Sequence, residues 1–108
     1  MIVGIPTDDG KHVSDHFGRS RYILVADTGK PGERNLVENP HQLAETEQGG
    51  HGMLLKMLRE REVRRVICSN LNPRMQKNLE SLGIQVVRCE ASAEIESVIR
   101  DDGDDASR

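Results

Sequence analysis

The sequence predicts an α/β fold with one mixed sheet, antiparallel in its first half and parallel in its second, and helices covering both faces. In the first half of the chain, short β-forming runs are separated by turn residues. In the second half, apolar residues at helical spacing alternate with short apolar runs, in the order helix, strand, helix, strand, helix. Right-handed crossovers would then add parallel strands to the antiparallel ones.

The first half is expected to be largely antiparallel β structure. Residues 2–6 form an apolar run, and residues 22–26 form a second run rich in β-forming side chains. Residues 27–32 have turn chemistry and lead into a weaker, edge-type strand at 34–38. The polar segment 14–20 between the first two runs is expected to be a loop or a single helical turn.

The second half opens with a helix predicted over about residues 53–62, because Leu54, Met57 and Leu58 fall at helical spacing. The glycines just before this segment are expected to loosen the chain at the helix entry. An apolar run at 63–68 predicts the next strand.

The following helix has clear signals at both ends. Asn72 is a suitable N-cap, Pro73 suits the first helical position, and Gly83 is placed to end the helix. An apolar run at 84–87 then predicts the last strand.

A final helix is predicted to carry Ile95, Val98 and Ile99 on one face, with Ser92 as its cap. After it the chain becomes acidic, and residues 101–108 are expected to form a disordered tail. The folded domain is therefore expected to span residues 1–100.

Composition narrows the classes of partner. The 108 residues contain no internal repeat and fit one domain. The net charge of -3 and the presence of only two aromatic residues, Phe17 and Tyr22, argue against nucleic-acid binding by phosphate neutralisation or base stacking. No apolar run approaches the roughly 20 residues that span a bilayer, so no membrane contact is expected and a cytoplasmic location is predicted.

One short segment concentrates polar chemistry on what is expected to be a loop, where binding residues are common. It places an acid, an imidazole and a guanidinium around a glycine, in the order Ser14-Asp15-His16-Phe17-Gly18-Arg19-Ser20.

Residues 16–19, His-Phe-Gly-Arg, follow an Ile-Pro-Thr-Asp strand end and resemble the N-terminal signature of the dinitrogenase iron-molybdenum cofactor family. The downstream layout is also similar to the family's. It includes Glu-Asn-Pro at 38–40, Gly-Gly-His-Gly at 49–52, and a strand, Asn-x-x-Pro, helix, Gly-Ile-x-Val run over 66–87. The resemblance covers about residues 1–100.

This resemblance implies a ribonuclease-H-like three-layer α/β fold with a five-stranded mixed sheet, which agrees with the predicted order of elements. It also implies a non-catalytic carrier or binding protein for the iron-molybdenum cofactor or a related metal-sulfur cluster, in cofactor assembly or delivery for nitrogen fixation. The implied partners are cluster donor and acceptor proteins, with the chain acting as a monomer or homodimer.

Four side chains are candidate metal ligands: His16, His51, Cys68 and Cys89. Imidazole is a borderline ligand that suits iron, whereas thiolate is soft and favours iron-sulfur species. The two cysteines should end neighbouring parallel strands at their carboxyl edge, where open α/β sheets place ligands, and His51 could reach the same end. Both cysteines also suit simple burial, and His16 also suits a turn histidine bonded to nearby backbone.

An anionic cluster would also need donors and positive charge. Gly49, Gly50 and Gly52 could let backbone amides approach it at a helix N-terminus. Arg19 could neutralise it, or could instead pair with Asp15. The glycine segment lacks the pattern of a P-loop or a dinucleotide fingerprint.

Two other functions remain open at the level of sequence. The first is a metal-free regulatory or protein-interaction domain that uses the same loops. The second, a metal-dependent nuclease, needs converging carboxylates. Asp8 and Asp9 follow the first strand, but the strand ending at Cys68 is followed by Ser69 and Asn70 and supplies no second carboxylate.

Overall fold

Five strands form one sheet in the order β3-β2-β1-β4-β5. The computed structural model describes residues 1–30 and 32–106. The strands are β1 (Ile2–Thr7), β2 (Tyr22–Asp27), β3 (Arg34–Glu38), β4 (Arg65–Cys68) and β5 (Gln85–Arg88). Strands β1, β2 and β3 pair antiparallel, whereas β4 and β5 extend the sheet from β1 in parallel. The predicted five-stranded mixed sheet is confirmed.

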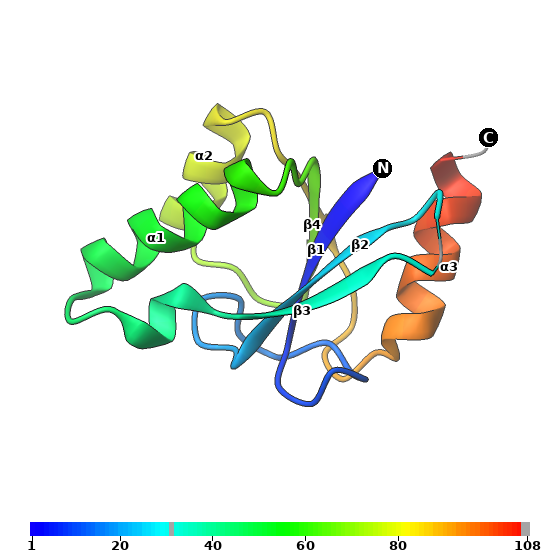
Figure 1. The fold of residues 1–108 in the computed structure, drawn as a ribbon, viewed down its shortest axis with the longest axis horizontal. Helices are drawn as coiled ribbons and strands as arrows, with labels where there is room; N and C mark the ends of the chain where they lie inside the picture. Colours follow the sequence, from blue (N-terminus) through cyan, green and yellow to red (C-terminus); the bar gives the residue numbers. More distant parts are fainter. Residues whose placement is uncertain (31, 107–108) are drawn as a thin grey trace.

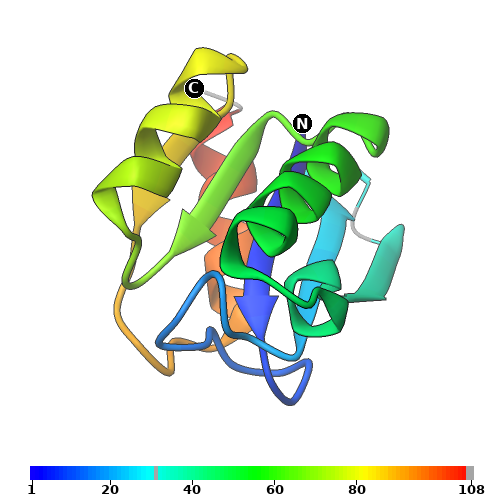
Figure 2. The same cartoon turned by 90° about the vertical axis from the view of Figure 1, so that its left-hand side faces the viewer.

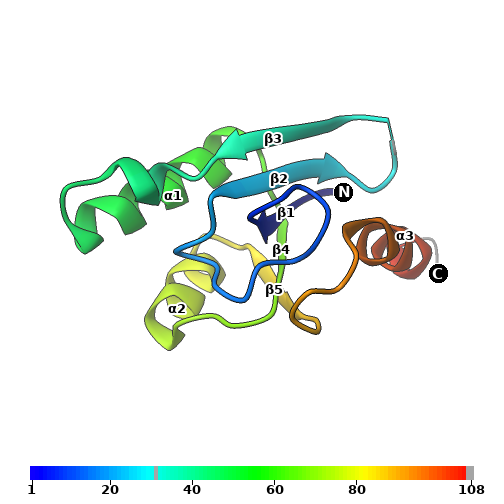
Figure 3. The same cartoon turned by 90° about the horizontal axis from the view of Figure 1, so that it is seen from below.

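Helices cover both faces of this sheet, as the three-layer prediction requires. Helices α1 (Glu47–Glu60) and α2 (Pro73–Ser81) lie on one side and α3 (Ile95–Ala106) lies on the other (Figure 1). Figure 3 shows the same separation from below. A short 3-10 helix, η1 (Pro40–Leu43), joins β3 to α1.

The alternation of side chains along each strand supplies both layers of the core. In β4, Val66 and Cys68 join the buried cluster under α1 and α2, whereas Ile67 joins the cluster under α3. Phe17 belongs to the first cluster and anchors the loop after β1 beneath α1 and α2. Aliphatic side chains make up most of both clusters, as expected from a sequence so poor in aromatic residues.

Helix α1 begins earlier than the sequence predicts, at Glu47 rather than near Met53. Thr46 is the reason, because its hydroxyl oxygen accepts from the Gly49 N–H at 3.0 Å and its carbonyl accepts from the Gly50 N–H at 2.9 Å. The glycines expected to loosen the entry are therefore helical residues.

The start of α3 also differs from the prediction. Ser92 does not cap the helix, because it lies in a turn with φ of 65° and its N–H donates to the Val13 carbonyl at 3.0 Å. The helix begins at Ile95, whose own N–H donates to the Lys11 carbonyl at 2.9 Å. Long-range bonds to the loop after β1 thus take the place of the expected cap.

Residues 101–106, expected to belong to a disordered tail, continue α3. The physical reason is an ion pair between Asp102, which is 7% exposed, and Arg65 on β4. The remaining two tail residues, 107–108, lie outside the described residues. None of the helices in the described ranges is long and apolar enough to cross a membrane.

Candidate functional site

A cavity of about 390 Å³ lies at the carboxyl end of β4 and β5, between α1, α2 and the loop after β1. This is the edge at which open α/β sheets place ligands. Figure 2 shows the loop after β1 at this end of the strands, near the start of α1. The lining residues come from five separate segments and are His16, Phe17, Gly18, Arg19, His41, His51, Asn70, Leu71, Asn72, Met75 and Arg88.

The His16 loop forms one wall of this pocket. His16 is exposed and makes an isolated parallel bridge with Asn70, which joins the loop to the segment after β4. Its N–H donates to the Ser14 hydroxyl oxygen at 3.3 Å. The side chain of Phe17 is only 2% exposed and holds the middle of the loop in the core. His16 and Arg19, on either side of it in the sequence, are exposed at the surface.

Two half-buried imidazoles, His41 and His51, form the opposite wall. Their ring centroids are 5.0 Å apart and the ring planes are inclined by 39°. Gly50 makes this arrangement possible, because a Cβ at that position would lie 2.8 Å from Cδ2 and 2.9 Å from Cγ of His41. His41 is a site residue that the sequence analysis missed; its position next to Pro40 carries no ligand motif.

The pocket is lined by two positively charged side chains, those of Arg19 and Arg88. Arg88 ends β5, and its guanidinium donates to the Ser69 carbonyl at 2.9 Å and to Oε1 of Gln76 at 3.1 Å. No acidic side chain is among the described residues that line the pocket. Arg88 was also missed, because in the sequence it reads only as the polar residue after an apolar run.

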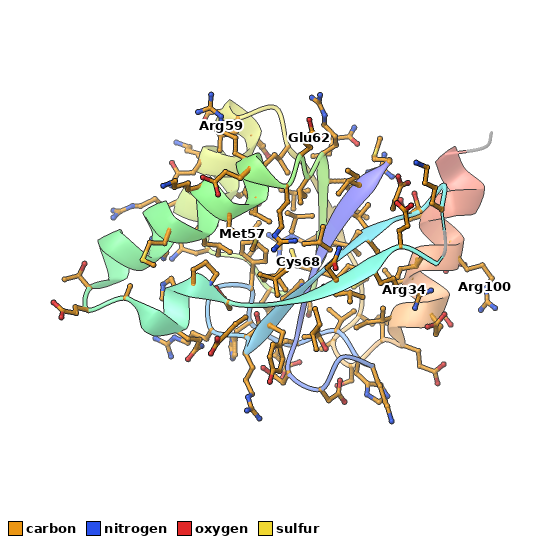
Figure 4. All side chains as sticks on the ribbon, in the orientation of Figure 1. Arg34, Met57, Arg59, Glu62, Cys68 and Arg100 are labelled. Atoms are coloured by element: carbon orange, nitrogen blue, oxygen red, sulfur yellow. The ribbon has the colours of Figure 1, made fainter. Side chains whose placement is uncertain are left out.

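Cys68 ends β4, and Cys89 lies one residue beyond the end of β5, close to the predicted position. The Cys89 N–H donates to the Cys68 carbonyl at 2.9 Å. Their side chains nevertheless belong to different layers: Cys68 lies in the cluster under α1 and α2 (Figure 4), and Cys89 packs against the cluster under α3. Neither lines the pocket. The structure therefore does not bring the two thiols together with His16 and His51.

Burial also lowers the acidity of both thiols. It raises the pKa of Cys68 to about 11, with the charge of Cys89 adding to the effect and Arg88 opposing it. The pKa of Cys89 is raised by burial and by Glu90. A thiol loses its proton when it binds a metal, so burial adds a cost to ligation by either cysteine.

The three glycines are less available than predicted. The N–H groups of Gly49 and Gly50 bond to the Thr46 cap. Gly52 lies further inside α1, with open space where a Cβ would be. Within the segment 49–52, His51 is the residue that lines the pocket.

A second hollow, of about 450 Å³, shares His16 and is acidic, with Asp8, Asp9 and Asp15 in its wall. Asp8 accepts from the Arg21 N–H at 2.9 Å, and Asp9 accepts from Nδ1 of His12 at 2.7 Å. Over residues 1–30 and 32–106, no group of three or more His, Cys, Asp or Glu side chains is arranged to hold a metal ion. The carboxylate set that two-metal hydrolysis needs is thus not found there.

The fold has relatives among solved structures. The crystal structure of a protein named PH0822 is 31% identical, with a TM-score of 0.78, and the match covers 97% of this chain and 90% of that one. The apo form of the orange protein from Desulfovibrio gigas is similar in fold alone, at 16% identity and a TM-score of 0.82, with 96% and 88% covered.

A third similar structure is an NMR structure of a NifB-like protein from Thermotoga assigned to the DUF35 family. It is 27% identical with a TM-score of 0.68, and the match covers 98% of this chain and 85% of that chain. A search of curated proteins gives no match.

The family model described as dinitrogenase iron-molybdenum cofactor matches residues 1–101, which include every residue lining the pocket. The resemblance first seen in His16-Phe17-Gly18-Arg19 therefore extends over nearly the whole chain, and the protein belongs to the dinitrogenase iron-molybdenum cofactor family.

Proposed function

We propose that this protein is a non-catalytic carrier that holds an iron-molybdenum cofactor or a related metal-sulfur cluster and passes it on during cofactor assembly or delivery. The observation that carries the proposal is the pocket at the carboxyl edge of the sheet. It combines three imidazoles with two guanidiniums and has no acidic side chain among its described lining residues. Family membership supports the same class of cargo.

The donor set suits such a cargo. Metal-sulfur clusters are anionic, so Arg19 and Arg88 would attract them and bond to their periphery. An imidazole such as that of His16 or His51 can bind iron directly. Protein thiolates are not needed for this arrangement, because the cluster brings its own sulfide and the pocket supplies nitrogen donors and charge.

Loose attachment fits the proposed transfer role. His16 and Arg19 are exposed at the mouth of the pocket, so a partner protein can approach the bound cluster directly. A few ligands, rather than a closed cage, permit release to an acceptor. We propose a cluster donor and a cluster acceptor protein as partners, in the cytoplasm, and nitrogen fixation as the process served.

The test is cluster retention. The protein is incubated anaerobically with isolated iron-molybdenum cofactor and desalted, and bound molybdenum, bound iron and visible absorption are measured. The proposal expects near-stoichiometric molybdenum in the wild type and a clear loss in His16→Ala. His12→Ala is the matched control, because His12 is exposed, bonds to Asp9 and lies outside the pocket. A wild-type protein that retains no molybdenum would contradict the proposal and favour a metal-free interaction domain.

A further inference from the structure

The two walls of the pocket come from segments far apart in the sequence, and two amide side chains join them. Asn39 precedes η1 and Gln42 lies within it. Asn39 is fully buried, whereas Gln42 is exposed. Neither side chain lines the pocket.

Asn39 bonds to both walls at once. Its Nδ2 donates to the Ser20 carbonyl at 3.0 Å and to the Phe17 carbonyl at 3.4 Å, which ties down the loop that carries His16. Its Oδ1 accepts from the His41 N–H at 3.0 Å, which holds the backbone of His41 in the opposite wall. One buried carboxamide thereby sets the distance between the loop and His41.

Gln42 adds a second connection further along the loop. Its Nε2 donates to the Arg19 carbonyl at 2.8 Å and to the Ser20 carbonyl at 3.3 Å. Because these bonds hold the backbone of Arg19 itself, they restrict where the guanidinium of that residue can reach. Because Gln42 is exposed, these bonds hold the loop in place without contributing to the packing of the core.

We propose that the side chains of Asn39 and Gln42, which we call the amide clamp, are positioning residues that hold the His16–Arg19 loop against His41 and so set how tightly the pocket retains its cargo. This inference rests on the proposed function. The clamp touches no cargo; it acts by keeping His16, Arg19 and His41 in one arrangement before the cargo arrives, which spares the cost of ordering them on binding.

Gln42→Met tests the clamp most cleanly, because methionine keeps the length of the side chain and its neutral charge but cannot donate. The expected result is faster hydrogen exchange at the Arg21 amide, which directly follows the Ser20 carbonyl that Gln42 holds and donates to Asp8 at 2.9 Å. Iron-molybdenum cofactor should also be lost about threefold to tenfold faster, the range that one net hydrogen bond supports. The urea midpoint should stay at the wild-type value. Gln85→Met is the matched control, because Gln85 is also exposed but its side chain bonds to Arg65, away from the pocket.

Asn39→Asp provides the second variant, since it keeps the acceptor for the His41 N–H and removes the donor to Phe17 and Ser20. It should speed exchange in the same loop more strongly than Gln42→Met does. Unchanged loop exchange and unchanged retention in Gln42→Met would overturn the inference, whatever Asn39→Asp does.

The exchange measurement separates this inference from the proposed function. If the wild type retains no cluster, the proposed function fails, but hydrogen exchange still reports on the clamp. Faster exchange at the Arg21 amide in Gln42→Met would then support the positioning role on its own, and unchanged exchange would reject it.

Discussion

Gly50 shows how a single residue without a side chain shapes the pocket. It is buried in α1 with an ordinary helical backbone, so its φ and ψ do not require glycine. What requires glycine is the imidazole of His41, which occupies the space where a Cβ would be. The sequence predicted the importance of the glycine segment but assigned it a different role, as a loop of free amides.

Gly50→Ala should displace His41. The added methyl would lie 2.8 Å from Cδ2 of His41, closer than real contacts allow, so the ring must shift and its contact with the His51 ring must change. We expect shifted imidazole resonances for His41 and His51 in NMR spectra and weaker cluster retention. Gly52→Ala is the control: its Cβ meets open space, so it should stabilise the helix by about 0.5–1 kcal/mol and leave both resonances in place. Equal spectra for the two variants would refute this role of Gly50.

Cys68 should behave as a core residue rather than as a ligand. With a pKa of about 11, on the order of one thousandth of its thiol is ionised at pH 8, and the side chain is fully buried. We expect iodoacetamide to modify half-buried Cys89 well before Cys68, as followed by mass spectrometry. Cluster retention should survive modification of Cys89. Rapid labelling of Cys68, or protection of either thiol by the bound cluster, would restore the cysteines as candidate ligands.

Among the secondary-structure elements, the sequence predicted correctly those helix ends that are set by residues next to them in the chain. The cap and stop of α2 are as predicted, because Oδ1 of Asn72 accepts from the Arg74 N–H at 2.8 Å and Gly83 adopts a φ of 78° after the helix. The starts of α1 and α3 were wrong. Thr46 was not recognised as a cap because a glycine run follows it, and α3 is started by bonds to residues 11–13 that no local pattern reveals.

The end of α3 depends on a long-range ion pair. Asp102→Ala would leave the guanidinium of Arg65, whose side chain is 16% exposed, with Gln85 as its remaining partner. We expect a loss of about 1–3 kcal/mol in the free energy of unfolding, measured by urea denaturation. Asp101→Ala, at an exposed position of the same helix, should change it by less than about 0.5 kcal/mol. Equal effects would show that the pair does not hold the helix.

At the scale of the whole molecule, the sequence predicted the order, direction and layering of the elements, because these follow from periodicity and connection rules. It also predicted the edge of the sheet where the pocket lies. It did not predict which side chains meet there: Cys68 and Cys89 point into opposite layers, while His41 and Arg88 enter the pocket. His41 reaches the pocket through the packing of η1 against α1, which no motif encodes.

Acidification should destabilise the fold. The pKa of Asp27 is lowered by hydrogen bonds from the Gly29 N–H and the N-terminal ammonium group, and that of Glu96 is lowered by Arg34. A carboxyl group whose pKa is lower in the folded state stabilises that state above its unfolded pKa, and this contribution is lost as the pH falls through the folded value. We expect a lower urea midpoint at pH 3 than at pH 7, and a smaller difference at high salt. A midpoint independent of pH would contradict the assignment of these pairs.

The proposed function requires that the pocket at the carboxyl edge of the sheet hold a metal-sulfur cluster. The most direct test compares amide NMR spectra of the protein before and after anaerobic addition of iron-molybdenum cofactor, because an iron cluster broadens resonances near it. We expect broadening centred on Gly18, His51, Asn70 and Arg88, with residues 59–64 at the opposite end of the sheet unaffected. Broadening centred elsewhere, or an unchanged spectrum, would contradict it.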